Sequence, residues 1–85
     1  MRAVEIYTTP VCPYCAIAKR LLQKKGVRYS EIDVSRDPAL REAMIQRAKG
    51  RRTVPQIFIG GVHVGGSDDL HYLDSAGRLD AMLAD

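Results

Sequence analysis

Cysteine is scarce in this chain, and its scarcity narrows the chemistry that the chain can perform. The 85 residues include only two cysteines, Cys12 and Cys15. A secreted disulfide framework uses more pairs, and a structural zinc site usually takes four protein ligands. The two histidines, His63 and His71, are the other candidate ligands, and their spacing fits no common zinc pattern. We therefore expect no metal site and interpret the cysteine pair as catalytic.

Long apolar runs and leader-like segments are also missing. No stretch approaches the ~20 apolar residues that a membrane-spanning helix needs, so we expect no membrane partner. Met1 and Arg2 lead straight into strand-like sequence, without the apolar core of a signal peptide. The cytoplasm is therefore the expected compartment, and a targeting segment removed during maturation is the open alternative.

Charge and aromatic content are modest as well. The formal net charge is +3, and aromatic residues make up 6% of the chain. No basic run interleaved with aromatics predicts stacking on bases, so we expect no nucleic-acid partner. The 46% hydrophobic and 27% charged content is ordinary for a globular protein. We expect a single domain over residues 1–85, and a monomer.

Strand-like and helix-like segments alternate along the chain. Asp37-Pro38 is a helix cap followed by a first-turn proline, and Gly60-Gly61 is a hairpin signal. The predicted strands are 3–7, 28–34, 54–59 and 62–64, and the predicted helices are 13–25, 38–49, 68–74 and 75–83. A strand–helix–strand unit with a right-handed crossover, then a helix and a hairpin, predicts an α/β fold. We expect a four-stranded mixed sheet with helices on both faces.

The two cysteines lie between the first strand and the first helix. Pro13 suits the first helical position, because its missing N–H would have no partner there. Cys12 then falls at the cap, near free backbone N–H groups and the positive end of the helix dipole. Such surroundings lower a thiol pKa from about 8.5 towards roughly 3.5–7.5. Cys15 lies one turn further on, close enough to attack a disulfide formed on Cys12, so the pair has the layout of a dithiol redox centre.

Three short motifs follow one another along the chain: Cys12-Pro13-Tyr14-Cys15, Thr53-Val54-Pro55-Gln56 and Gly65-Gly66-Ser67-Asp68-Asp69. Their order and spacing resemble those of the glutaredoxin family, in its small bacterial dithiol form, over nearly the whole chain. The resemblance implies a thioredoxin-like fold. It also implies that Cys12 is the nucleophile and Cys15 the resolving thiol of a redox-active disulfide.

The resemblance further implies a glutathione site. Pro55 would follow a cis peptide bond that exposes the Val54 backbone to pair, strand-like, with the cysteinyl part of glutathione. The helix N-terminus beyond Ser67 would bind the γ-glutamyl carboxylate, and Asp68 would pair with the amine. The residues implied to bind glutathione are Tyr14, Thr53, Val54, Pro55, Gly66, Ser67 and Asp68.

One position departs from the family pattern. Many glutaredoxins carry a lysine three residues before the first cysteine, and this chain has Thr9 there. That lysine would contact the glycyl carboxylate of glutathione and help to stabilise the thiolate. We expect Arg51, or alternatively Arg52, to supply the missing charge from across the groove.

The resemblance implies a glutathione-dependent dithiol oxidoreductase that reduces protein disulfides and glutathione mixed disulfides by thiol–disulfide exchange. It would need no metal or organic cofactor; glutathione would be the co-substrate, and disulfide-containing or glutathionylated proteins would be its partners. The alternative enzyme is a thioredoxin-like electron donor to ribonucleotide reductase, loaded by a flavoprotein reductase, which Thr9 slightly favours. The alternative from another class is a non-catalytic binding module such as an iron–sulfur carrier, which Pro13 disfavours by stiffening the cysteine loop.

Overall fold

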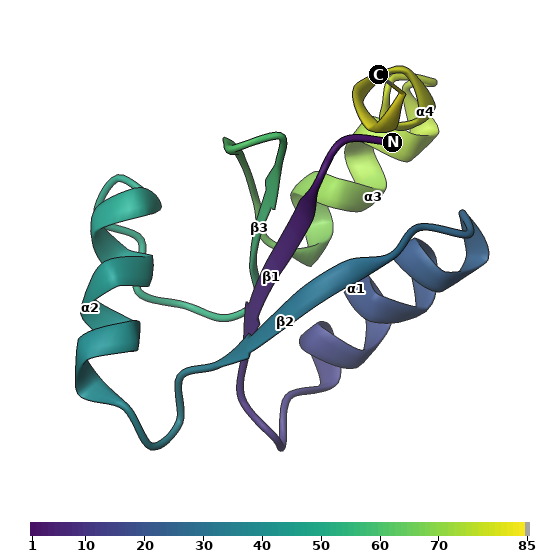
Figure 1. Ribbon diagram of the computed structural model, residues 1–85. Coiled ribbons are helices and arrows are strands. Elements are labelled where there is room, and N and C mark those ends of the chain that lie inside the picture. The colour runs from purple at the N-terminus through teal and green to yellow at the C-terminus, as the bar shows by residue number, and fades with distance from the viewer. Residues whose placement is uncertain (85) are drawn as a thin grey trace.

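The computed structural model describes residues 1–84. Its elements in chain order are β1 (Val4–Thr8), α1 (Pro13–Lys24), β2 (Tyr29–Asp33), α2 (Pro38–Arg47), β3 (Gln56–Ile59), β4 (Val62–Gly65), α3 (Ser67–Ser75) and α4 (Leu79–Leu83). The strands form one sheet in the order β2-β1-β3-β4, and Figure 1 shows β1 between β2 and β3. β1 pairs in parallel with β2 and antiparallel with β3, and β4 pairs antiparallel with β3. The predicted four-stranded mixed sheet is confirmed.

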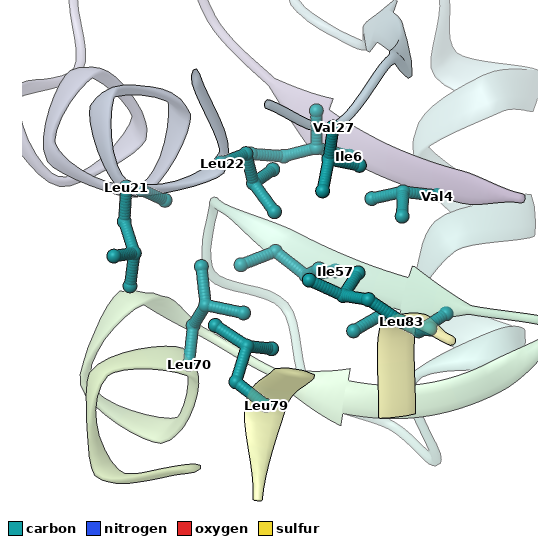
Figure 2. Close-up of a cluster of buried hydrophobic side chains, with 11 residues drawn as sticks. Val4, Ile6, Leu21, Leu22, Val27, Ile57, Leu70, Leu79 and Leu83 are labelled. Carbon is teal, nitrogen blue, oxygen red and sulfur yellow. The ribbon is translucent and has the colours of Figure 1, made fainter. Parts of the chain in front are cut away.

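Helices cover both faces of this sheet, as predicted. Figure 1 shows α2 on one side of the sheet and α1 with α3 on the other. Val4 and Ile6 of β1 and Ile57 and Ile59 of β3 point towards α1 and α3, because alternate residues of a strand share a face. The larger apolar cluster, shown in Figure 2, consists of Val4, Ile6, Ala18, Leu21, Leu22, Val27, Ile57, Ile59, Leu70, Leu79 and Leu83. This cluster fixes the position of α1, and with it the start of the helix where the cysteines lie.

The cluster under α2 is smaller and partly polar. Its apolar members are Tyr7, Val34, Met44, Ile45, Ala48 and Phe58. Arg47 of α2 donates to the two carboxylate oxygens of Glu5 at 2.9 and 3.2 Å, and its guanidinium carbon lies 4.0 Å from the centroid of the Phe58 ring. The Glu5 carboxylate raises the pKa of Arg47 above its usual value, so the cation persists.

The end of the chain differs from the sequence prediction. The predicted helix 75–83 is only α4, and α3 runs one residue further at each end than the predicted 68–74. Gly77 is the reason, because its φ of +72° is a left-handed conformation that ends a helix. The N–H of Gly77 donates to the carbonyl of Asp74 at 3.0 Å, and the next N–H donates to the carbonyl of Leu73 at 2.9 Å. This Schellman ending stops α3 and separates it from α4.

Candidate functional site

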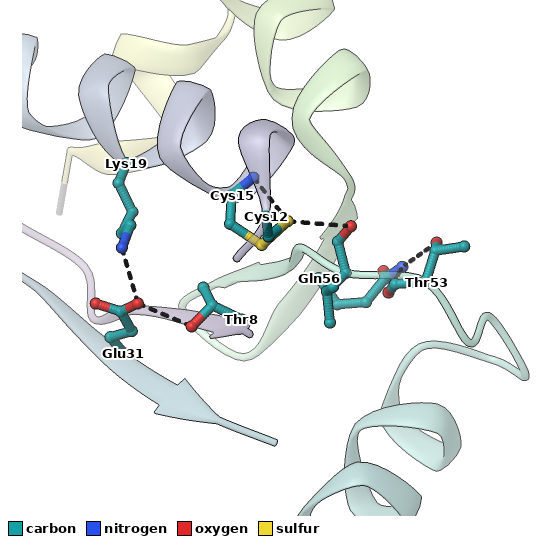
Figure 3. The surroundings of a disulfide bond; sticks show 8 residues. Thr8, Cys12, Cys15, Lys19, Glu31, Thr53 and Gln56 are labelled. Atoms are coloured by element: carbon teal, nitrogen blue, oxygen red, sulfur yellow. Dashed lines mark hydrogen bonds and ion pairs between the residues drawn. A yellow bond between two sulfur atoms is a disulfide. The ribbon is translucent and has the colours of Figure 1, made fainter. Parts of the chain in front are cut away.

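The two cysteines lie where α1 begins, just beyond the carboxyl end of β1. Cys12 is the N-cap residue, with φ −146° and ψ 101°, and its Sγ accepts a hydrogen bond from the Cys15 backbone N–H at 3.1 Å. The two residues are joined by a disulfide bond (Figure 3). The first turn of α1 contains no acidic residue, so no carboxylate offsets the positive end of the helix dipole beside the sulfur. The predicted cap position of Cys12 is confirmed.

The two sulfurs differ in their access to solvent. Cys15 is 1% exposed, whereas Cys12 is only partly buried. A disulfide on another molecule therefore meets Cys12 first. Cys15 is placed to act on a bond that has already formed at Cys12, three residues away. This difference suits Cys12 to the first attack and Cys15 to the resolving step.

A cis proline segment faces the cysteines. The Val54–Pro55 peptide bond is cis, as the family resemblance implies. The Val54 carbonyl oxygen lies 3.9 Å from Cys12 Sγ (Figure 3). The strand predicted over 54–59 begins only at Gln56, so Val54 lies outside the paired part of the sheet. The backbone of this residue is therefore available next to the reactive sulfur.

A groove of about 230 Å³ lies beside the disulfide. Three segments that are far apart in the sequence line it: the start of α1, Arg51 with residues 53–55, and residues 66–69. The lining residues are Tyr14, Arg51, Thr53, Val54, Pro55, Gly66, Ser67, Asp68 and Asp69. Every non-cysteine site residue predicted from the sequence is in this set. Of the two arginines considered as a replacement for the lysine, Arg51 lines the groove and Arg52 does not.

Asp69 is the lining residue that the sequence analysis missed. Its Oδ2 accepts hydrogen bonds from the Gly66 N–H at 2.8 Å and from Arg51 Nη1 at 3.0 Å. The Gly66 N–H, followed by the Arg51 guanidinium, holds the pKa of Asp69 below its usual value, so the carboxylate is charged at neutral pH. An acid three residues after a helix cap is half of a capping box. That spacing is the signal in the sequence that would have found Asp69.

Gly65 allows this arrangement to form. Its φ is +120°, a conformation that glycine adopts at little cost. A Cβ atom at this position would lie 2.8 Å from Arg51 Nη1 and closer still to the Asp69 carboxylate. A larger residue would therefore push the arginine and the aspartate out of place. The first glycine of the Gly65-Gly66 pair thus supports the groove from behind.

A second polar cluster lies near the disulfide, between α1 and β2 (Figure 3). Glu31 Oε2 accepts hydrogen bonds from Lys19 Nζ at 2.9 Å and from Thr8 Oγ1 at 2.8 Å. Lys19, and then Thr8, holds the pKa of the Glu31 carboxyl below its usual value. Thr8 is 1% exposed. These bonds tie the carboxyl end of β1, which leads into the cysteine loop, to both neighbouring elements.

Comparison with known proteins agrees with this geometry. The model of the glutaredoxin family matches residues 4–64. The chain belongs to the glutaredoxin family. It is 56% identical over 84 residues to a glutaredoxin of Pseudomonas aeruginosa, covering 99% of both chains. It is 54% identical over 83 residues to glutaredoxin 3 of Escherichia coli K12, covering 98% of this chain and 99% of that one.

Solved glutaredoxins share the fold of this glutaredoxin. The solution structure of the glutaredoxin from Brucella melitensis matches with a TM-score of 0.86 and 58% identity, over 98% of this chain and 89% of that one. The crystal structure of a buckwheat glutaredoxin–glutathione complex matches with a TM-score of 0.86 and 35% identity, over 94% of this chain and 74% of that one. The expected thioredoxin-like fold is confirmed.

Membership of the family establishes the general chemistry. This glutaredoxin is a thiol–disulfide oxidoreductase, and its structure contains a disulfide between Cys12 and Cys15. Within residues 1–84, no group of three or more His, Cys, Asp or Glu side chains is placed to hold a metal ion. Over the same residues, no helix has the length and apolar character to cross a membrane.

Proposed function

We propose that this glutaredoxin uses glutathione to reduce glutathione mixed disulfides and protein disulfides. The observation that carries the proposal is the groove beside Cys12. It joins a free backbone edge at Val54, a helix N-terminus at Ser67 and a cation at Arg51. Glutathione is an extended tripeptide with a thiol, two carboxylates and an amine. The groove offers a complementary group for each of its ends.

The N-terminus of α3 suits the γ-glutamyl end. The first N–H groups of a helix have no partner within the helix, and they favour an anion. The α-carboxylate of the γ-glutamyl group would bind at Ser67, and the exposed carboxylate of Asp68 would pair with its ammonium group. The Val54 backbone would pair with the cysteinyl residue, which places the glutathione sulfur beside Cys12.

Arg51 is the proposed partner of the glycyl carboxylate. It would supply the charge of the lysine that is absent at Thr9. Asp69 takes one of its N–H groups, and the guanidinium has further donors for a carboxylate. Arg52 is a weaker candidate because its side chain does not line the groove.

The proposed reaction is thiol–disulfide exchange. The Cys12 thiolate attacks the glutathione sulfur of a mixed disulfide, the old S–S bond breaks, and the substrate leaves as a thiolate that takes a proton from water. A second glutathione thiolate then attacks the sulfur of the bound glutathione. Oxidised glutathione leaves, and the Cys12 thiolate is restored. This route needs Cys12 alone.

A protein disulfide would take a longer route. Attack by Cys12 gives a mixed disulfide with the protein and releases one protein thiolate. The Cys15 thiolate then attacks Cys12 Sγ, releases the second protein thiolate and leaves the Cys12–Cys15 disulfide seen here. Two glutathiones reduce that bond and become oxidised glutathione. No organic cofactor takes part in either route.

A second candidate is favoured by one observation. Thr9 stands where many glutaredoxins have a glutathione-binding lysine, and a weak glutathione site would suit a thioredoxin-like donor. Such a protein would receive electrons from a flavoprotein reductase and pass them to ribonucleotide reductase. We place this function second because the groove retains every other expected feature.

The test is the reduction of a cysteine–glutathione mixed disulfide, coupled to glutathione, glutathione reductase and NADPH. We expect wild type to turn over, Cys12→Ser to lose all activity, and Cys15→Ser to keep a substantial part of it. Wild type that is inert with glutathione but turns over with thioredoxin reductase would replace the proposal by the second candidate. A dead Cys15→Ser variant would show that the monothiol route is wrong.

A further inference from the structure

A buried glutamine supports the cis proline segment from the α2 side of the sheet. Gln56 is 0% exposed. Its Nε2 donates to the Thr53 carbonyl at 2.9 Å and lies 3.3 Å from Thr53 Oγ1 (Figure 3). These bonds close a loop across Val54 and Pro55, the two residues between donor and acceptor. The segment that lines the groove is thus fastened by a side chain that does not line it.

His63 of β4 fixes the orientation of this glutamine. His63 Nε2 lies 2.7 Å from Gln56 Oε1. Because the amide nitrogen of Gln56 already faces Thr53, its oxygen must accept, and the histidine must carry its proton on Nε2. A glutamine turned the other way would set its oxygen against the Thr53 carbonyl. The pair therefore has one consistent arrangement of donors and acceptors, running from His63 through Gln56 to Thr53.

The regular pairing of β3 with β4 brings His63 to this place. Phe58 lies directly opposite His63, so the two side chains share the face of the sheet on which Gln56 also lies. The extra residue of β4 comes only after His63, where Ile57 lies opposite Gly65. The His63 ring packs against Phe58 with centroids 5.0 Å apart, on the same face as Gln56. The packing holds the ring so that Nε2 reaches the glutamine.

We propose that Gln56 and His63 are a positioning pair that sets the Thr53–Pro55 edge at the correct distance from Cys12. The inference rests on the proposed function, because the partner of that edge is the peptide backbone of a glutathione disulfide. The pair touches neither the substrate nor the sulfurs. Its loss should weaken capture of a peptide disulfide and leave the reactivity of the Cys12 thiolate unchanged.

Two kinds of measurement separate this role from general support of the fold. The first is KM and kcat for the cysteine–glutathione mixed disulfide in the glutathione reductase assay. The second is the rate at which the reduced protein reacts with dithiodipyridine, an uncharged disulfide with no peptide backbone. Displacement of the Val54 backbone changes KM for the glutathione mixed disulfide and leaves the rate with dithiodipyridine unchanged. Damage to the cysteine loop changes both.

The variants are chosen to remove or keep one hydrogen bond. His63→Phe keeps a ring against Phe58 but cannot donate to Gln56, and His63→Gln keeps a donor at nearly the same distance. In Gln56→Met the new side chain has a similar length but makes no hydrogen bond to Thr53 or to His63. Val62→Thr is the matched control, because this neighbour on β4 is 56% exposed and lies outside the groove.

We expect His63→Phe and Gln56→Met to raise KM about three- to tenfold, the size of effect that corresponds to the net contribution of one hydrogen bond. Their kcat and their rate with dithiodipyridine should stay near wild type, as should all values of His63→Gln and Val62→Thr. Because His63 acts through Gln56, the double variant that combines His63→Phe with Gln56→Met should have the same KM as Gln56→Met alone. Circular dichroism would establish that each variant is folded.

Each other outcome overturns the inference in a distinct way. An unchanged KM in both His63→Phe and Gln56→Met, with active wild type, overturns it and leaves the proposed function intact. A rate with dithiodipyridine that falls by the same factor as KM rises would mean that Gln56 and His63 support the fold in general and not the Val54 backbone in particular. Wild type that reacts with dithiodipyridine but never with the glutathione disulfide overturns the proposed function, and this inference with it.

Discussion

The two walls of the site are built in different ways. The cysteine wall, residues 12–15, is continuous in the sequence, and its geometry follows from the start of one helix. The other wall, which is the binding wall of the proposed glutathione site, consists of Arg51, residues 53–55 and residues 66–69, which the β3–β4 hairpin brings together. The reaction chemistry is therefore encoded locally, whereas recognition depends on contacts between distant segments.

The supports of the two walls also differ. Behind the cysteine wall, Ala18 and Leu22 of α1 are fully buried in the larger apolar cluster. The binding wall is held by single polar contacts, such as those of Asp69 with Arg51 and of Gln56 with Thr53. One hydrogen bond contributes about 0.5–1.5 kcal/mol net. Single substitutions in the binding wall should therefore change recognition while the protein stays folded.

The largest effect on the binding wall is expected from Arg51→Ala. A charge-assisted hydrogen bond is stronger than a neutral one, and we expect KM for the glutathione mixed disulfide to rise about tenfold. Arg52→Ala is the matched control, since it removes the same charge one residue away and outside the groove. Steady-state kinetics of both variants measure the difference. Equal increases in KM for the two variants would mean that Arg51 acts only through its positive charge and makes no specific contact with glutathione.

The same variant distinguishes the two ends of glutathione. The Asp69 contact holds Arg51 near the N-terminus of α3, where the γ-glutamyl group is expected. We expect the defect of Arg51→Ala to disappear when the glycyl carboxylate of the substrate is converted to an amide. A tenfold defect that persists with the amide would assign Arg51 to the γ-glutamyl carboxylate instead.

A smaller effect is expected from Asp69→Asn, which keeps the size of the side chain and removes its charge. The Asp69–Arg51 ion pair is about half exposed, so the stability change should be about 1 kcal/mol or less. We expect KM to rise about two- to threefold as the arginine loses its partner. Asp74→Asn is the control, because it breaks an ion pair with Lys25 away from the groove. Equal KM values for the two variants would mean that Asp69 does not hold the binding wall.

The sequence predicts the cysteine wall well because its signals are local. Cys12 at the cap, Pro13 after it and a strand before it specify the layout without knowledge of the rest of the fold. The alternation of strands and helices likewise gives the mixed sheet, and the resemblance to a family supplies the groove residues. Two differences remain: the strand predicted from residue 54 begins at Gln56, and the end of the chain is divided into two short helices because Gly77 ends α3.

The supports of the binding wall are harder to predict. Arg51 and Asp69 are eighteen residues apart, and their contact depends on the backbone conformation of Gly65. His63 and Gln56 belong to different strands, and their contact depends on how the His63 ring packs against Phe58. From the sequence, His63 is considered only as a candidate zinc ligand, and Gln56 only as the last residue of the Thr53–Gln56 motif. The Gly60-Gly61 turn predicts the hairpin that joins their strands, but it does not predict which of their side-chain atoms form a hydrogen bond.

The smallest effect concerns the response of the binding wall to pH. Burial first, and then the positive charges of Arg51 and Lys49, lowers the pKa of His63 below 6.5. The unfolded chain therefore binds a proton at His63 more readily than the folded protein does. His63 costs no stability above pH 6.5, and it destabilises the fold as the pH falls from 6.5 towards the pKa of His63 in the folded protein. His63→Gln does not titrate, and urea unfolding at about pH 7.5 and pH 5.5 should show a smaller loss of stability on acidification than in wild type. Parallel curves for the two proteins would mean that His63 is not held neutral by its surroundings.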